Sequence, residues 1–494
     1  MKKILLAGVS ALALTASCVG SLDDDYNVDP KSPTTAPAAG FIANAERSLT
    51  RAVVSPNVNS NPLRYFTQYW AATDYPTEAR YDLNTRNIPT NFWNSLYRDC
   101  IQDLRAAKTA IPNDITIPEA NKANALAVAE VLEIYAWATL VETYGNIPYS
   151  EALDFNKPRP KYDDQTTIYN DLISRLDVVI RALDTNASVS TGLGTNDLIN
   201  GGSTVLWTKF AYAMKLRMAL VIADVDNTKA KAMAESTVAS AGKLLASNAD
   251  NIDLTFNGTF PNTNPLFEDL VRSGRQDFVG ANYFIDRLKG VAGPVKAVDP
   301  RLNDYFNAAT SASLPAGSFV GGVVGTTNPK TTISQPGTKL RAQTLPGVLM
   351  SYAQVEFLLA EARSRGYAVG GTAESHYNAG VTASILEWGG TAAEATAYLA
   401  NPTVAYTTAP GTEKQKIAYQ EWVALYNQPV ESWTTWRRLD YPNLPIAVQA
   451  VTDVIPVRYV YPVVEQNING ANYSEAAAAI GGDKVGTKLF WDKF

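Results

Sequence analysis

Side chains that commonly carry catalysis or hold metal ions are scarce in this sequence. Its 494 residues include a single histidine, His376, and two cysteines, Cys18 and Cys100. A zinc site built on histidine pairs is therefore excluded, and a nucleophile–histidine triad would have to use His376. No cluster of cysteines is available to bind a metal. We predict no metal site and no cofactor, and we expect no catalytic role for His376.

Carboxylates are the one abundant chemical group, with 48 Asp and Glu residues. Two suitably placed carboxylates are enough for a glycoside hydrolase, and they leave little local pattern in a sequence. An exported carboxylate-dependent glycan hydrolase is therefore an alternative that the sequence leaves open. The segment GGDKVGTK, Gly481–Lys488, differs from a phosphate-binding loop because its lysine does not follow the second glycine. We predict a turn there.

The first eighteen residues have the order of a secretory signal. Two lysines precede the apolar run Ile4–Leu14, and small residues then lead to Cys18. The run is too short to cross a membrane, which takes about 20 apolar residues, and such a signal is removed from the mature protein. The block LTASC resembles a bacterial lipobox, although Thr15 stands where leucine is usual. We predict a lipoprotein signal peptide at 1–17; the alternative is an ordinary secretory signal with an incidental cysteine.

The rest of the chain divides into a tether and one domain. Residues 18–36 are predicted to comprise an acylated Cys18 and a flexible segment rich in acidic residues and proline. Residues 37–494 are predicted to form a single domain. Cys100 is then left without a disulfide partner, and its spacing with Phe92, Leu96 and Leu104 places it on an apolar helical stripe. We expect a buried structural thiol.

Composition narrows the possible partners. Hydrophobic residues make up 46% of the chain and charged residues 18%, which is typical of a globular protein with a sizeable core. The formal net charge is −6 and the pI is near 5.2, which argues against nucleic acid and against an anionic membrane surface as electrostatic partners. We therefore expect contact with a membrane through the lipid anchor only.

Helical patterns dominate from residue 37 onward. The clearest is Glu119–Tyr144, whose apolar residues cover more than one face, as expected for a buried central helix. Gly145 and Pro148 are predicted to end it. Further helices are predicted at 165–184, 203–224, 227–247, 345–367, 373–388, 411–427 and 430–438. Many of these pair at spacings like those of tetratricopeptide helix pairs, so the predicted fold class is mostly α.

Strand and loop signals complete the prediction. Phe319–Val324 and Val454–Val460 are short strand candidates. Three long regions lack a helical period: Asp74–Thr90, Asn248–Gly274 and residues 308–343. Loops this long inside a helical domain are usually functional or disordered.

Ordered sequence blocks identify a family. The run YGNIPYSEA begins at Tyr144, and YDDQ begins at Tyr162. WTKFA, KLR, DPRL, EFLLAEA, YNAG, ESW and WRR follow in order, and the ending has YP at Tyr461 and LFWD at Leu489. Together these blocks resemble the SusD/RagB family of nutrient-binding outer-membrane lipoproteins, over almost the whole mature chain. We interpret most blocks as scaffold: Gly145 as a helix terminator, Arg437 and Arg438 as ties to helix ends or buried acids.

The resemblance implies a function without catalysis. Family members are lipid-anchored at the Bacteroidetes cell surface, cover a SusC-like TonB-dependent transporter, and pass a glycan or a peptide to it. The resemblance therefore implies an outer-membrane protein facing the cell exterior, a transporter partner, and no enzymatic activity. Asp23–Asp25 resemble the export signal that follows the acylated cysteine in such lipoproteins; a plain solvated tether is the alternative. A structural lid with little ligand affinity of its own is a further alternative.

Candidate ligand-binding residues come from loops that combine aromatic and polar side chains. Flat aromatic rings suit the C–H faces of sugars, and Asn, Asp or Arg can bond to hydroxyl groups. The predicted binding residues are Trp70, Asp74, Tyr75, Arg80, Tyr81, Asn84, Arg275 and Phe278, and Asp277 is close to the last two. Two alternatives remain: Trp70 and Tyr81 only cover the core, or the groove binds a peptide through its backbone.

Overall fold

The segment predicted as a central helix forms α6, Lys122–Tyr144, which is buried along almost its whole length. Of the described residues, only Glu119–Tyr144 is long and apolar enough to cross a membrane, and 89% of its apolar window is buried inside the protein. It is therefore a core helix. Gly145 follows at φ 88°, where a Cβ would lie 2.9 Å from Leu489 Cδ2. The predicted stop is confirmed, since only glycine fits this conformation and this space.

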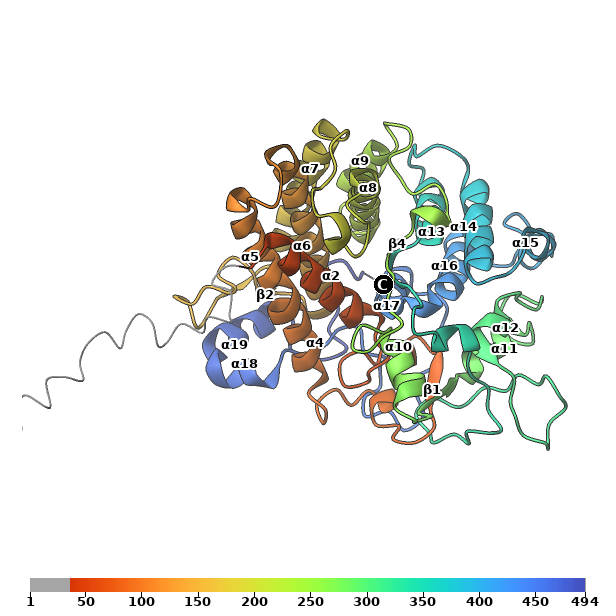
Figure 1. Cartoon of the computed structure of the whole chain (residues 1–494). Coiled ribbons are helices and arrows are strands. Elements are labelled where there is room, and N and C mark those ends of the chain that lie inside the picture. Colours follow the sequence, from red (N-terminus) through yellow and green to blue (C-terminus); the bar gives the residue numbers. More distant parts are fainter. Residues whose placement is uncertain (1–35, 494) are drawn as a thin grey trace, which may run out of the picture. The chain divides into compact units, whose positions relative to one another are not determined.

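The computed structural model describes residues 36–493. Residues 1–35 lie outside this range, so the signal peptide, Cys18 and the acidic tether remain predictions. Contacts group Ala38–Phe494 into one unit, and Figure 1 shows how its helices are arranged.

Helices that follow one another in the sequence pack against each other: α6 with α7, α8 with α9, α13 with α14, and α16 with α17. The helices of eight or more residues are α2 (Ala38–Val54), α4 (Ile88–Leu96), α5 (Gln102–Ala110), α6, α7 (Gln165–Thr185), α8 (Thr204–Val221), α9 (Asn227–Thr237), α13 (Tyr352–Ser364), α14 (Ala373–Glu387), α15 (Ala392–Leu399), α16 (Glu413–Ala424), α17 (Pro429–Leu439) and α19 (Gly470–Ala479). Shorter ones are α3 (Leu63–Phe66), α10 (Pro265–Phe267), α11 (Asn282–Leu288), α12 (Leu302–Tyr305) and α18 (Val463–Ile468). The predicted mostly α fold with paired helices is confirmed.

Side-chain caps begin several of these helices where the sequence places Asp, Ser or Thr. Asp164 Oδ1 accepts a hydrogen bond from the Thr167 amide at the start of α7, with an N–O distance of 2.9 Å. Thr372 and Thr412 open α14 and α16 with reciprocal capping boxes. Each cap satisfies backbone amides that have no partner inside the helix.

Strands are few and short, and each pairs with one other strand in antiparallel orientation. The pairs are β1 (Trp70–Ala72) with β5 (Phe278–Gly280), β2 (Ile147–Pro148) with β3 (Tyr162–Asp163), β4 (Ile252–Leu254) with β8 (Gly347–Met350), and β6 (Phe306–Asn307) with β7 (Gln335–Pro336). These strands fix the ends of long loops rather than forming a layer of their own.

Some predicted boundaries are wrong. The segment 345–367 is not one helix, because Gly347–Met350 pairs with β4 and Ser351 caps α13 only afterwards. The helix predicted to residue 247 ends at Thr237, before a turn in which Gly242 has φ 78°. Phe319–Val324 contributes one isolated bridge, and Val454–Val460 forms no strand. The secondary structure of these segments depends on tertiary contacts, which the periodicity of the sequence does not reveal.

A buried network of charged groups joins several sequence blocks. Arg217 on α8 donates two hydrogen bonds to Glu142 on α6, with N–O distances of 2.8 and 2.6 Å, and one to Glu431 on α17 at 2.7 Å. Tyr169 donates to Glu142 at 2.9 Å. Each buried charge therefore has a partner, which is the condition for tolerating it in a core.

Three further buried arginines also have hydrogen-bond partners, which are carboxylates for Arg301 and Arg438 and backbone carbonyls for Arg437. Arg301 and Asp299 form a buried bidentate pair with N–O distances of 2.8 and 2.7 Å. Arg437 donates to the carbonyl oxygen of Glu142 at 2.6 Å, and Arg438 pairs with Glu361. The interpretation of these blocks as scaffold is confirmed, including the predicted roles of Arg437 and Arg438.

Cys100, His376 and the segment Gly481–Lys488, whose residue types could serve catalysis or ligand binding, each make contacts within the fold. Cys100 is fully buried, and burial raises the pKa of its thiol well above the usual value. His376 Nδ1 lies 2.6 Å from Glu356 Oε2. Gly481–Lys488 is the predicted turn, and Arg458 donates to its Asp483 at 2.6 Å.

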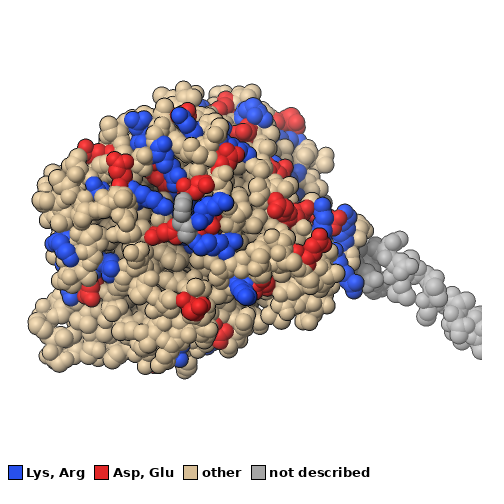
Figure 2. Space-filling model, turned by 180° about the vertical axis from the view of Figure 1, so that it is seen from behind, with Lys and Arg blue, Asp and Glu red and all other residues tan. Residues whose placement is uncertain are grey.

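Charges of both signs are interspersed on the face shown in Figure 2. Lysine and arginine side chains lie beside aspartate and glutamate over the upper part of this view, and much of the lower left carries neither kind. Positive and negative groups therefore neutralise each other over short distances on this face.

Candidate functional site

The pairing of β1 with β5 brings two distant loops together. Trp70 is opposite Gly280 and Ala72 is opposite Phe278, and the Thr73 amide donates to the Asp277 carbonyl at 2.9 Å. The loop after β1 and the loop before β5 therefore leave the strand pair side by side.

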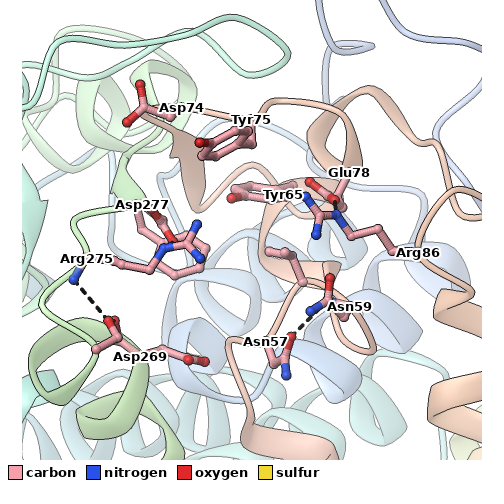
Figure 3. A pocket seen from close by; sticks show the side chains of 13 residues that line it. Asn57, Asn59, Tyr65, Asp74, Tyr75, Glu78, Arg86, Asp269, Arg275 and Asp277 are labelled. Carbon is pink, nitrogen blue, oxygen red and sulfur yellow. Dashed lines mark hydrogen bonds and ion pairs between the residues drawn. The ribbon is translucent and has the colours of Figure 1, made fainter.

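An open depression lies where these loops meet, and we call it the Tyr75 hollow. It consists of two adjoining spaces of about 180 and 500 Å³ that share Asp74, Tyr75, Arg86, Arg275 and Asp277. The remaining polar side chains around it come from several loops and turns: Asn57, Asn59, Tyr65, Glu78, Asp269, Ser273, Gln276 and Lys330. Figure 3 shows most of these side chains around one common space.

Tyr75 is the exposed aromatic residue of the hollow. Its side chain is among the exposed large hydrophobic groups, with 64% of the residue accessible. The backbone of Tyr75 has φ 53°, a conformation that non-glycine residues rarely adopt. The Arg275 guanidinium lies 5.9 Å from the ring centroid. Strained backbone at an exposed ring is typical of a functional loop.

Paired charges surround Tyr75. Arg275 pairs with Asp277 at 2.7 Å, Arg86 pairs with Glu78 at 2.5 Å, and Lys330 pairs with Asp74 at 2.9 Å. These pairs hold the side chains in place, while the exposed atoms of Arg275, Asp74 and Arg86 are free to contact a ligand in the hollow. The arrangement offers donors and acceptors beside a flat ring, as a hydroxyl-rich ligand requires.

The pKa of Asp269, which lines the hollow, is raised above its usual value. It lies in the π-helical turn Glu268–Arg272, and burial, followed by the carboxylates of Glu268 and Asp277, raises its pKa to about 6. It lines the hollow and thus can accept hydrogen bonds as a carboxylate above that pH.

Three of the predicted binding residues are part of the core. Trp70 is 1% exposed, and its indole donates to the Tyr426 hydroxyl at 2.8 Å. Tyr81 is 2% exposed, and its hydroxyl accepts from the Ala447 amide at 2.9 Å. Phe278 is also buried, with its ring centroid 5.0 Å from that of Trp70, although it lines part of the hollow. The rings of Trp70 and Tyr81 are therefore not available to stack on a ligand.

The other predicted residues divide into two groups. Asp74, Tyr75 and Arg275 line the hollow together. Arg80 lies elsewhere and donates to the Gly325 carbonyl at 2.7 Å, while Asn84 belongs to an exposed turn in which its amide donates to Asp82 at 2.9 Å.

Sequence reasoning missed several lining residues. Arg86 and Glu78, Asp269, and Lys330 belong to the three long regions without helical period, so the loops were recognisable but the individual side chains were not. Asn57 and Asn59 lie in a short segment after α2, SPNVNSNP, whose Pro, Asn and Ser residues signal a turn but do not mark a binding site. Within residues 36–493, no group of three or more His, Cys, Asp or Glu side chains is placed to hold a metal ion.

The family follows from a comparison of the whole chain with known families. The SusD-like family, described as starch-binding and associating with the outer membrane, matches residues 30–462. This chain belongs to the SusD-like family. The matched range includes every residue that lines the Tyr75 hollow. Among curated proteins, none matches the chain.

Solved structures with the SusD-like fold resemble the chain over nearly its full length. A chitin-binding protein has 26% identity and a TM-score of 0.78, covering 92% of this chain and 100% of its own. A SusD homologue from Bacteroides uniformis has 25% identity and a TM-score of 0.73, covering 93% and 100%. A chitin-binding SusD homologue from Flavobacterium johnsoniae has 23% identity and a TM-score of 0.77, covering 92% and 98%, and shows the fold alone.

Proposed function

We propose that the Tyr75 hollow binds a glycan, without catalysis. The observation that carries this proposal is one exposed tyrosine ring beside ordered charged groups in an open hollow. A sugar ring stacked on Tyr75 would place its hydroxyl groups beside Arg275, Asp277 and Asp74. The openness of the hollow suits an oligosaccharide whose chain continues beyond the contacted units.

The comparisons support a glycan over a peptide. The family is described as starch-binding, and a chitin-binding protein is among the similar solved structures. The first candidates are therefore oligosaccharides derived from starch and from chitin.

We also propose where the protein works. Cys18 carries acyl chains in the outer membrane, the domain faces the cell exterior, and a SusC-like TonB-dependent transporter receives the glycan. Several acyl chains hold a protein firmly where one chain does not. Tethering the binder next to a transporter raises the effective concentration of the captured glycan at the entrance.

Binding measurements with a variant test the site. Titration calorimetry with oligosaccharides from starch and chitin is expected to give saturable binding, and Tyr75→Ala is expected to weaken it about 10-fold or more, the effect of losing an aromatic platform. Phe155→Ala is the matched control, because Phe155 is 94% exposed and does not line the hollow. Equal loss in both variants, or none in Tyr75→Ala, would contradict this site.

The same samples distinguish the alternative functions. Release of shorter sugars during incubation would indicate a glycan hydrolase instead. Saturable binding of peptides but not of glycans would show that the ligand is a peptide. Capture of the transporter without binding of any glycan or peptide would indicate a purely structural lid.

A further inference from the structure

A second hollow lies away from Tyr75 and shares no residue with it. It has a volume of about 250 Å³ and is formed by β4, β8, the C-terminal end of α14 and the segment after α16. In Figure 1, β4 lies on the same side as α13 and α14, and β1 lies apart near α10. We call this space the Asp253 hollow.

Acceptor atoms that line the Asp253 hollow lack partners among the described residues. Among the described residues, nothing donates a hydrogen bond to the Asp253 carboxylate or pairs with it. Asn248 Oδ1 is buried without a hydrogen-bond partner, although its amide nitrogen donates to the Ala383 carbonyl at 2.9 Å. The Glu387 carboxylate receives only a long contact of 3.4 Å from Asn251. Asp253 and Glu387 are half-buried. Acceptors without partners favour a ligand that donates.

The one cation that lines the hollow does not neutralise these carboxylates. Lys339 Nζ donates to the backbone carbonyl of Glu387 at 2.5 Å, which caps the end of α14, and lies 5.3 Å from the Trp388 ring centroid. Burial lowers the pKa of Lys339. Glu387 stands at the negative end of a helix, where a carboxylate is unfavourable and a cation is favourable.

The pKa values of Asp253 and Glu387 are both raised, as expected for carboxyl groups with little neutralising charge nearby. Burial raises the pKa of Asp253 to about 6. Burial also raises the pKa of Glu387 to about 7, with Lys339 acting against it and Asp253 adding to it. Within residues 36–493, Asp253 therefore has no compensating positive charge, and Lys339 offsets the burial of Glu387 only in part.

The walls distinguish between possible cations. Leu345, Pro346, Val348 and Trp388 give the hollow a mainly apolar lining. A bare Ca²⁺ or Mg²⁺ ion takes oxygen ligands on all sides, which these walls do not offer. A primary ammonium group has three donors on one end and a carbon body on the other, which suits a hollow that combines acceptors with apolar walls.

We propose that the Asp253 hollow binds an organic primary ammonium ligand of about the size of one sugar or one amino-acid side chain. Asp253 and Glu387 accept from the ammonium group, and Trp388 and Val348 contact the carbon body. The ammonium group can come from an amino sugar or from an amino-acid amine. This site is independent of glycan binding at Tyr75.

Titration of the full mature chain with matched ligand pairs tests the proposal. One pair is glucosamine and N-acetylglucosamine; the other is Nα-acetyl-lysine amide and its Nε-acetylated form. We expect saturable binding of at least one amine, and binding of its acetylated partner weaker by about 10-fold or more, because a charge-assisted hydrogen bond is lost. The amine that binds identifies the source.

Variants locate the binding. Asp253→Asn and Glu387→Gln are each expected to weaken amine binding by about 10- to 100-fold. Glu119→Gln, which neutralises a carboxylate with an 88% exposed side chain, and Tyr75→Ala are expected to leave it unchanged. Asp253→Asn is expected to fold, because it removes an unpartnered charge; circular dichroism checks this, and Glu387→Gln provides the same test if it fails to fold.

The proposal is overturned if neither amine binds, if acetylated partners bind equally well, or if both hollow variants bind like the wild-type chain. Loss of glycan binding in Tyr75→Ala with amine binding retained would show that the two hollows bind their ligands independently.

Discussion

Arg217 and Glu142 lie 75 positions apart in the sequence and form a buried bidentate ion pair, with N–O distances of 2.8 and 2.6 Å. Glu431 shares the same guanidinium at 2.7 Å. Three helices, α6, α8 and α17, are joined at this point. Arg217 and Glu431 belong to two of the blocks that identify the family, KLR and ESW, so these blocks have a structural role in the scaffold.

Removing the Arg217 side chain is expected to lower the free energy of unfolding substantially. Arg217→Met leaves Glu142 and Glu431 buried without their partner, and we expect a loss of about 3–5 kcal/mol in the free energy of unfolding. Urea denaturation measures it. Arg98→Met is the control: Arg98 pairs with Asp99 at an exposed site, and a change of at most about 1 kcal/mol is expected. Equal effects would contradict the assigned role of the buried pair.

The two aromatic residues Trp70 and Tyr75 are expected to behave oppositely. Trp70→Ala empties a core position and should lower the free energy of unfolding by about 3–5 kcal/mol. Tyr75→Ala changes an exposed side chain and should alter it by about 0.5 kcal/mol or less. Thermal or urea unfolding of both variants, measured together with glycan titration, separates the core role from the binding role. A stable Trp70→Ala variant would contradict the burial of Trp70.

Stability should fall at alkaline pH because of Glu421. Burial, the largest cause, raises the pKa of Glu421 to about 8, and the carboxylates of Glu361 and Glu431 add to it. The folded state then holds a proton that the unfolded state releases near pH 4.5, so stability decreases as pH rises towards 8 and beyond. We expect a loss of about 2–3 kcal/mol between pH 6 and 9 from this group.

Glu421→Gln tests this prediction, because the amide does not titrate. Urea denaturation at pH 6 and pH 9 should show a smaller decrease for the variant than for the wild-type chain. The same decrease in both proteins would assign the alkaline loss to other groups.

Gly145 should not tolerate a side chain. It has φ 88°, and an added Cβ would lie 2.9 Å from Leu489 Cδ2, so Gly145→Ala should lower the free energy of unfolding by about 1–3 kcal/mol. Gly40 in α2 has nothing within 4 Å of an added Cβ, and Gly40→Ala should be neutral or stabilising by up to about 1 kcal/mol. Thermal unfolding of the two variants compares them directly.

Membrane attachment should depend on one cysteine. Cys18→Ser is expected to abolish labelling with a palmitate analogue and to release the protein from the membrane fraction, since no acyl chain is attached. A variant in which Asp23, Asp24 and Asp25 are replaced by alanine is expected to keep the label, but external protease should no longer reach it. Unchanged protease access in that variant would remove the export interpretation of the aspartates.

Much of the architecture could be predicted from local signals. The helix at α6 follows from an apolar segment without a polar face, and its end at Gly145 follows from a residue that adopts positive φ. Caps such as Asp164 and Thr372 are readable because a short side chain bonds to its own helix. The order of the blocks was enough to identify the family.

The binding residues were less predictable, because exposure depends on what packs against each side of a segment. Trp70 and Tyr75 lie five positions apart in one polar and aromatic loop region, yet Trp70 packs against Tyr426 and Phe278 whereas Tyr75 is 64% exposed. Arg80 is similar in kind to Arg275 but bonds to the distant Gly325 carbonyl. Residue type and spacing do not distinguish these cases.

The sequence by itself therefore determined the helical fold, the family, the predicted export signal and the regions from which a ligand site would be built. Only the tertiary structure decided which side chains line the same space. The β1–β5 pairing places Arg275 beside Tyr75, and the β4–β8 pairing sets Asp253 opposite Val348, in the hollow that Glu387 of α14 also lines. The physical reason is that local propensity acts between near neighbours in sequence, whereas strand pairing and burial join segments that are far apart.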